Sequence, residues 1–102
     1  MYKLEYLPSA KKDMADIAYY ISHTLVNPDA AVRLAEELVS AAETLRDFPY
    51  AYPVFTPIRP LAHEYRKLIV RNYIMFYWVE EQSKTIILAR VIYNRRDLDS
   101  QL

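Results

Sequence analysis

Five residues in the second half of the chain carry side chains that can hold an anion. Arg66 and Arg90 interrupt otherwise apolar runs, while Tyr93, Arg95 and Arg96 stand where the last apolar run ends. Guanidinium groups grip phosphate or carboxylate through charge-assisted hydrogen bonds, and a phenol can donate one more. The alternative is that each arginine forms an ordinary ion pair with a carboxylate nearby in the sequence, namely Glu64, Asp97 or Asp99. The residue types alone therefore predict only a site for something anionic.

Other kinds of site are disfavoured by residues that the chain lacks. It has no Cys and no Gly, so it offers neither a thiolate nucleophile nor a glycine-rich phosphate loop. Its two histidines, His23 and His63, lie far apart in the sequence without metal-ligand spacing or an adjacent nucleophile. We therefore expect no metal and no cofactor.

Charge is balanced overall but not along the chain. The net charge is zero, yet residues 1–51 hold five Lys/Arg and eight Asp/Glu, whereas residues 52–102 hold eight and five. The basic second half is where an anionic partner or an acidic protein surface would dock. No segment reads as a signal sequence or as the ~18–20 apolar residues of a membrane span. We expect one cytoplasmic domain over residues 1–102, without a membrane partner.

Hydrophobic periodicity predicts two helices after a short strand. Residues 2–7 alternate like a strand that Pro8 ends, and apolar residues recur at helical spacing over 9–25, with Ser9 as a candidate cap. A second helix begins at Asn27, Pro28 and Asp29, which form a typical helix start, and its apolar stripe runs to Phe48. The two helices should form an antiparallel hairpin.

Three strands are predicted to follow a proline-rich connection over 49–60. They cover 65–70, 73–79 and 85–93, with a tight turn at Arg71-Asn72 in which Asn72 would take the positive φ. The fold class is α+β in the order β-α-α-β-β-β. The helical hairpin packs on one face of an antiparallel sheet, and residues 94–102 form a short C-terminal helix or tail.

Strand alternation sets an expectation for the site. It places Arg66 with Leu68 and Val70 on one side of its strand, and Arg90 with Leu88 and Ile92 on one side of the last strand. We expect the arginines to gather on the sheet face that the helices leave bare.

The order of these elements and several local strings resemble the RelE/ParE superfamily of bacterial type II toxins, over nearly the whole chain. The matching strings are "LPSAKKDMADIAYYI", "NPDAAVRLAEEL", "LRDFP", "EYRKLIVRNYIMFYWV" and "ILARVIYNRRDLDSQL". The resemblance implies a growth-inhibiting toxin held inactive by an antitoxin whose C-terminal segment wraps it. RelE-like members cut messenger RNA in the ribosome, whereas ParE-like members trap DNA gyrase on cleaved DNA.

Carried over residue by residue, the resemblance favours the ParE-like mode slightly. RelE-like nucleases have an arginine at the start of the motif that here reads "IMFYWV", where this chain has Ile74, and many have His where this chain has Tyr93. A phenol with a pKa near ~10 is a poor base at neutral pH. Positions that match the ParE-like pattern hold Arg66, Arg95 and Asp97.

Three functions stay open on this basis. In the gyrase-directed mode, which has no catalytic activity of its own, the resemblance implies a target-binding surface of Arg66, Tyr93, Arg95 and Arg96. In the ribosome-dependent endoribonuclease, Tyr93 is the general acid, and phosphate is held by Arg66, Arg90 and Arg95. The third possibility is an inactive module that only binds its antitoxin.

Overall fold

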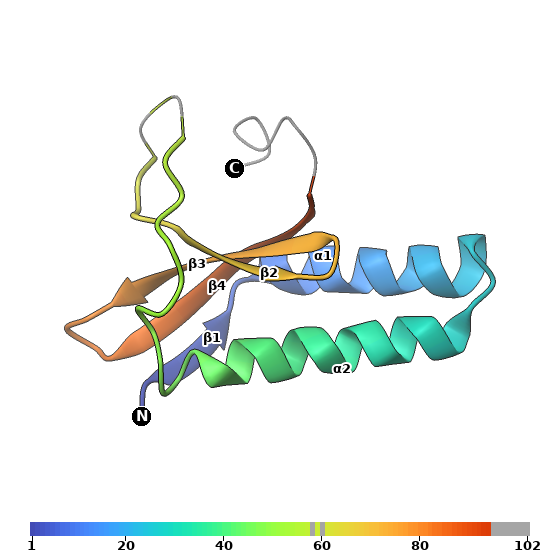
Figure 1. Ribbon diagram of the computed structural model, residues 1–102, viewed down its shortest axis with the longest axis horizontal. Helices are drawn as coiled ribbons and strands as arrows, with labels where there is room; N and C mark the ends of the chain where they lie inside the picture. Colours follow the sequence, from blue (N-terminus) through green and yellow to red (C-terminus); the bar gives the residue numbers. More distant parts are fainter. Residues whose placement is uncertain (58, 60, 95–102) are drawn as a thin grey trace.

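The computed structural model describes residues 1–57, 59 and 61–94, which form one sheet and a long helical hairpin (Figure 1). The chain order is β1 (Lys3–Tyr6), α1 (Pro8–Tyr19), the π-helical turn η1 (Tyr20–Thr24), α2 (Pro28–Thr44), β2 (Arg66–Val70), β3 (Tyr73–Glu80) and β4 (Thr85–Tyr93). The predicted α+β class and element order are confirmed. No helix in the described part of the chain is both long enough and apolar enough to cross a membrane.

The sheet has the order β1-β4-β3-β2 and is mixed rather than fully antiparallel. β2–β3 and β3–β4 pair antiparallel as predicted, but β1 runs parallel to β4, with Lys3 opposite Thr85 and Tyr6 opposite Leu88. A parallel neighbour needs a long connection, and the two helices and two strands between β1 and β4 provide it.

Local chemistry explains both helix starts. Asn27 caps α2, since its Oδ1 accepts a hydrogen bond from the Ala30 N–H at 3.2 Å, and Pro28 and Asp29 follow as predicted. The expected Ser9 cap is wrong: Pro8 already occupies the first turn of α1 after Leu7. The Ser9 hydroxyl instead donates to the Ala89 carbonyl at 2.6 Å, which ties α1 to β4.

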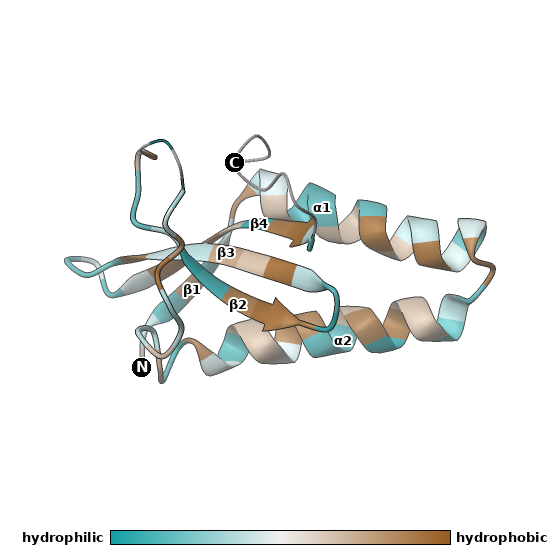
Figure 2. Ribbon diagram, turned by 45° about the horizontal axis from the view of Figure 1, so that its top comes forward, coloured by the Kyte–Doolittle hydropathy of each residue, from teal (hydrophilic) through white to brown (hydrophobic). Residues whose placement is uncertain are grey.

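The main core lies between the helical hairpin and one sheet face. Its fully buried members come from both layers and include Ala10, Leu34, Leu38, Ala42, Leu45, Leu68, Met75, Tyr77, Ile86, Leu88 and Val91. The apolar residues of β2 run alongside α2 (Figure 2). The stripe of α2 was predicted too long. The helix ends at Thr44, and the following turn leaves Phe48 65% exposed.

A β-bulge in β4 changes which side chains share a face. Phe76 pairs with Arg90 while the next residue, Tyr77, pairs with Leu88, so Ala89 is the extra residue. Leu88 therefore packs in the main core, whereas Ile92 packs with Ile74 and Phe76 on the other face. The expectation that Leu88, Arg90 and Ile92 point the same way is wrong.

The face away from the helices is also partly covered. Phe55 and Tyr65, from the connection between α2 and β2, pack on Ile74, Phe76 and Ile92. Backbone hydrogen bonds at 2.8 Å (Phe55 N–H to Tyr65 C=O) and 3.1 Å (Lys67 N–H to Pro53 C=O) hold this connection along the edge of β2. The second face is thus not the bare surface that the sequence suggested.

Candidate functional site

A groove of about 870 Å³ opens where the helical hairpin extends past the end of the sheet. One wall is the hairpin itself, and the other is formed by the β2–β3 turn and the last residue of β4. The lining residues are Asp16, Ile17, Tyr20, Ile21, Leu25, Asn27, Ala30, Arg33, Leu34, Arg71, Asn72, Tyr73 and Tyr93. Its walls come from α1, η1, α2, β3 and β4 and from the turns between them, so the fold has to be complete before the groove exists.

The chemistry of the lining is one-sided. The aliphatic residues Ile17, Ile21 and Leu34 give an apolar floor. Among the described lining residues, the side chains that can donate hydrogen bonds are two arginines, two asparagine amides and three phenols, whereas Asp16 is the one carboxylate. Such a groove suits a segment that is apolar on one side and acidic at its edges.

Two of the three described residues with positive φ lie at or beside this groove, and the third, Lys84, lies in the β3–β4 turn. The π-helical turn η1 forms part of the hairpin wall, and Val26, at the hairpin tip, has φ 51°. Arg71 has φ 54° on the opposite wall, so the prediction that Asn72 takes the positive φ is wrong. Left-handed conformations in residues other than Gly cost on the order of 1–3 kcal/mol and tend to occur at functional sites. π-helical turns have the same tendency.

The strained Arg71 is held by a bidentate ion pair. Its Nε and Nη2 donate to the two carboxylate oxygens of Glu37 on α2, at 2.5 and 2.6 Å. Hydrogen bonding from Arg71 lowers the pKa of Glu37, and the nearby Arg33 lowers it further. Arg33 itself forms no ion pair with any residue in the described part of the chain. The groove therefore has one arginine that is engaged and one that is available.

Tyr93 faces this groove, not the opposite sheet face. It pairs with Tyr73 across β3 and β4, and the two rings meet edge to face with centroids 5.7 Å apart. Tyr73 packs against the main core on the helical side, and Tyr93 is 47% exposed beside it. Burial is the main cause that raises the pKa of Tyr73, and the neighbouring phenols of Tyr93 and Tyr20 raise it further.

Arg66 lies under the connection that follows α2. It shares the helical side of β2 with Leu68 and Val70, as alternation predicted. Its Nη1 donates to the Tyr52 carbonyl at 2.8 Å, and its guanidinium lies 5.0 Å from the centre of the Tyr50 ring. The Arg66 side chain is only 18% exposed, and its Nη2 forms an ion pair with Glu64 Oε1 at 3.7 Å.

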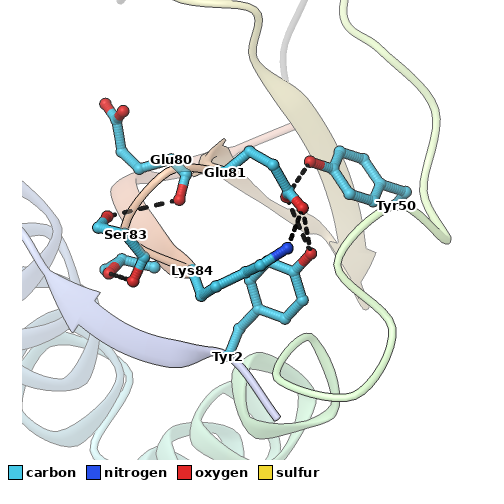
Figure 3. Close-up of polar contacts among 7 residues, drawn as sticks. Tyr2, Tyr50, Glu80, Glu81, Ser83 and Lys84 are labelled. Carbon is cyan, nitrogen blue, oxygen red and sulfur yellow. Dashed lines mark hydrogen bonds and ion pairs between the residues drawn. The ribbon is translucent and has the colours of Figure 1, made fainter.

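Tyr50 also belongs to a polar cluster around Glu81, which Figure 3 shows. Through the contact of its ring with the guanidinium, Tyr50 links Arg66 to this cluster. The Glu81 carboxylate accepts hydrogen bonds from Tyr50 at 2.6 Å and from Tyr2 at 2.8 Å, and Lys84 forms an ion pair with it. The Lys84 hydrogen bond, followed by those from Tyr50 and Tyr2, lowers the pKa of Glu81 to about 2. The cluster joins the N-terminus, the post-α2 connection and the β3–β4 turn, so Arg66 belongs to a structural network.

Arg90 is paired across the sheet edge. Its Nε and Nη2 donate to Asp13 of α1 at 2.6 and 3.1 Å, and the same carboxylate accepts the Val91 N–H at 2.9 Å. The ion pair expected as the alternative role is present, but with a carboxylate from the first helix. β1 pairs with β4 only as far as Leu88, so Asp13 satisfies an edge amide that has no strand beside it.

The structure does not gather the predicted arginines on one surface. Arg66 lies on the helical side of β2, whereas Arg90 pairs with Phe76 of the opposite face and turns toward Asp13. The expectation of a shared bare face is therefore wrong for these two residues. Arg95, Arg96 and Asp97 lie outside the described residues.

Four groove residues were missed by the sequence reasoning, namely Tyr20, Arg33, Arg71 and Tyr73. Tyr20 directly precedes the apolar position Ile21, and Arg33 precedes Leu34, so each borders the stripe of its helix. Large side chains beside an apolar stripe are the signal that could have indicated a second lined surface.

Solved structures share this fold. A chain in a structure of a chromosomal ParDE toxin–antitoxin system from P. aeruginosa superposes with a TM-score of 0.75 at 18% identity, covering 93% of this chain and 98% of that one. A RelBE2 toxin–antitoxin complex from Mycobacterium tuberculosis superposes with a TM-score of 0.63 at 18% identity, covering 90% of this chain and 96% of that one. The E. coli RelBE complex superposes with a TM-score of 0.58 at 16% identity, covering 94% of this chain and 100% of that one. These likenesses establish the RelE/ParE toxin fold.

Sequence comparison narrows the class to a family. A family model described as the ParE toxin of the type II toxin–antitoxin system parDE matches residues 4–98. The chain therefore belongs to the ParE toxin family. A search of curated proteins gave no match.

Proposed function

We propose that this chain inhibits bacterial growth in the cytoplasm unless an antitoxin binds it, and that it acts in the ParE-like mode on DNA gyrase. Membership in the ParE toxin family supports this proposal, as does the fold shared with a ParDE toxin. In this mode the chain has no catalytic activity of its own and needs no cofactor. It holds gyrase on cleaved DNA by binding.

The positions of the predicted phosphate-holding residues Arg66 and Arg90 are the observation that carries the gyrase-directed mode. A ribonuclease site needs a proton donor and positive charge within contact distance of one phosphate. The partners of Arg66 and Tyr93 on β3 are Tyr77 and Tyr73, four residues apart, which corresponds to ~13 Å along a strand. Arg66 and Arg90 are also engaged with Tyr52 and Asp13.

The proposed target surface combines Tyr93 with Arg66, Arg95 and Arg96. Tyr93, at the exposed end of β4, is the aromatic anchor, a residue type that often dominates binding energy. Arg66 contributes through the 18% of its side chain that reaches solvent.

The antitoxin occupies the groove between the helical hairpin and the β2–β3 turn. An apolar floor with a rim of donors matches an amphipathic segment that folds as it binds. The solved relatives include toxin–antitoxin complexes of the same fold, which supports a protein partner of this kind.

The fold shared with the isolated E. coli RelE toxin favours a second candidate. In a RelE-like, ribosome-dependent endoribonuclease, Tyr93 would donate the proton, and Arg66, Arg90 and Arg95 would hold the phosphate. This function requires Arg66 and Arg90 to leave their present partners when RNA binds.

Induction of the chain in bacteria without its antitoxin separates these functions. The gyrase-directed mode predicts a DNA-damage response and a rise in gyrase covalently held on DNA. A rapid loss of translation with cuts in ribosome-bound messages would instead establish the endoribonuclease. Normal growth at a verified level of folded protein would show a module that only binds an antitoxin.

A further inference from the structure

Three tyrosines from three elements converge at the sheet end of the groove. Tyr20 comes from η1, Tyr73 from β3 and Tyr93 from β4, and all three line the same cavity. The edge-to-face contact of Tyr73 with Tyr93 fixes two of the rings, with centroids 5.7 Å apart. The fold thus brings several phenol groups together beside an apolar floor.

Two of these phenols, Tyr20 and Tyr73, can donate hydrogen bonds to a bound segment. The side-chain hydroxyls of Tyr20 and Tyr73 form no hydrogen bond with any residue that the structure describes. Asp16, the one carboxylate in the lining, is already paired with Lys12 at 2.6 Å. Burial and the other phenols raise the pKa of Tyr73, so its hydroxyl stays protonated at neutral pH. The hydroxyl can therefore donate a hydrogen bond to an anionic acceptor.

Arg33 adds charge to the same groove. It is exposed on α2, one residue before the buried Leu34, and forms no ion pair in the described chain, although its charge acts on Glu37 from a distance. Arg71 on the other wall is bound to Glu37, so Arg33 is the arginine that can receive an outside carboxylate. Charged hydrogen bonds of this kind are stronger than neutral ones.

We propose that the groove receives an acidic amphipathic segment of the antitoxin, with one carboxylate bonded to the hydroxyls of Tyr20 and Tyr73 and a second paired with Arg33. This inference rests on the proposed antitoxin occupant and adds the chemistry that selects it. A phosphate-rich ligand such as RNA fits this groove less well, because Ile17, Ile21 and Leu34 form an apolar floor in the groove. The site is a specificity element for the partner.

The test uses this chain purified alone and the protein encoded by the short reading frame beside its gene, with affinity measured by calorimetry. Tyr20→Phe with Tyr73→Phe, and separately Arg33→Gln, should each weaken binding about 10- to 100-fold, as expected for lost hydrogen bonds to charged groups. Matched controls are Tyr19→Phe, whose ring stacks on His23 outside the groove, and Lys11→Gln on the exposed side of α1. Both should stay within about twofold of the unchanged chain, the range of ordinary surface changes.

Double-mutant cycles locate the carboxylates. Each Asp or Glu in the partner's C-terminal segment is changed to Asn or Gln. For the carboxylates that bind the groove, the loss of binding free energy should be non-additive with the loss caused by one of the two groove variants. Full affinity of the tyrosine and Arg33 variants would overturn this inference while leaving an antitoxin in the groove. Failure of the unchanged chain to bind the neighbouring product would overturn the proposed antitoxin pairing itself.

Discussion

Two tyrosines that pack in the main core differ in whether their hydroxyl has a partner. Tyr77 is fully buried and its hydroxyl donates to the Pro49 carbonyl at 2.9 Å, whereas the buried hydroxyl of Tyr6 meets no partner in the described chain. Desolvation by burial raises the pKa of Tyr77 to about 12 and also raises that of Tyr6. The same residue type is thus satisfied at one site and unsatisfied at the other.

This contrast gives a matched pair of substitutions. Tyr77→Phe should lower the free energy of unfolding by about 1–3 kcal/mol, because it leaves the Pro49 carbonyl without its donor. Tyr6→Phe should leave stability unchanged or raise it slightly, since it removes a hydroxyl that has no partner. Urea denaturation of both variants checks this, and equal losses would contradict the assignment of the two hydroxyls.

Arg95 and Arg96 carry a prediction on activity. If they belong to the target surface, Arg95→Ala with Arg96→Ala should relieve toxicity while the circular dichroism spectrum and the melting temperature stay those of the unchanged chain. Growth assays after induction, with soluble protein quantified on blots, measure this. Normal killing by a soluble double variant would remove both residues from the site.

Glu81 predicts a pH dependence of stability. Its pKa falls from the usual 4.5 to about 2 in the folded chain, first through Lys84 and then through Tyr50 and Tyr2. A lowered folded-state pKa means that the stabilisation is complete above pH 4.5 and is lost as the pH falls toward 2. Urea denaturation at a series of pH values should show this loss, and Glu81→Gln should make the acid side of the curve flatter. An unchanged acid slope in that variant would show that the cluster contributes nothing.

At the scale of elements, the contact between α1 and the edge of β4 depends on one carboxylate. Asp13 is 15% exposed and holds both the Arg90 guanidinium and the Val91 N–H. Removing it leaves a half-buried charge and an edge amide unsatisfied at once. Because Arg90 is part of this contact, changing Arg90 can reduce function simply by destabilising the fold. Any Arg90 variant therefore needs a measurement of stability beside its activity.

Asp13→Ala should therefore destabilise the chain by about 2–4 kcal/mol, since breaking a partly buried ion pair strands its partner. Asp16→Ala on the same helix is the control, because its ion pair with Lys12 is 64–76% exposed and should matter little. Thermal or chemical unfolding measures both variants. Similar small changes at the two positions would contradict the role given to Asp13.

The elements that could be predicted are those fixed by local chemistry. Asn27, Pro28 and Asp29 start α2 as their residue types require, and the three late strands follow β-branched and aromatic runs. The bulge at Ala89 could not be predicted, because it is set by the register of β4 against β3, a contact between distant parts of the sequence. That single extra residue reversed the expected direction of Arg90 relative to Leu88.

The candidate site was only partly predictable for a related reason. Tyr93 was identified at the strand end, but its side could not be fixed until the register of β4 against β3 was known. Arg71 takes a positive φ that its residue type disfavours, and its side chain binds Glu37, 34 residues away. Such long-range contacts leave no mark in local sequence.

At the scale of the whole molecule, the two sheet faces have different partners. The helical hairpin covers one face and extends past its end to form the groove, while Phe55 and Tyr65 cover part of the other (Figure 1). Tyr93 lies at the groove, so a bound antitoxin segment and a bound target would compete for the same tyrosine. Under the proposed function, an antitoxin in the groove would therefore neutralise the chain by covering part of the proposed target surface.

A gyrase cleavage assay with purified components tests the central claim most directly. Supercoiled plasmid, DNA gyrase, ATP and this chain are incubated, then treated with detergent and protease to release DNA that was held in the cleaved state. The account predicts linear DNA that increases with the concentration of this chain, and its suppression by the antitoxin. Unchanged plasmid, together with cuts in messenger RNA on ribosomes incubated with the same preparation, would contradict it.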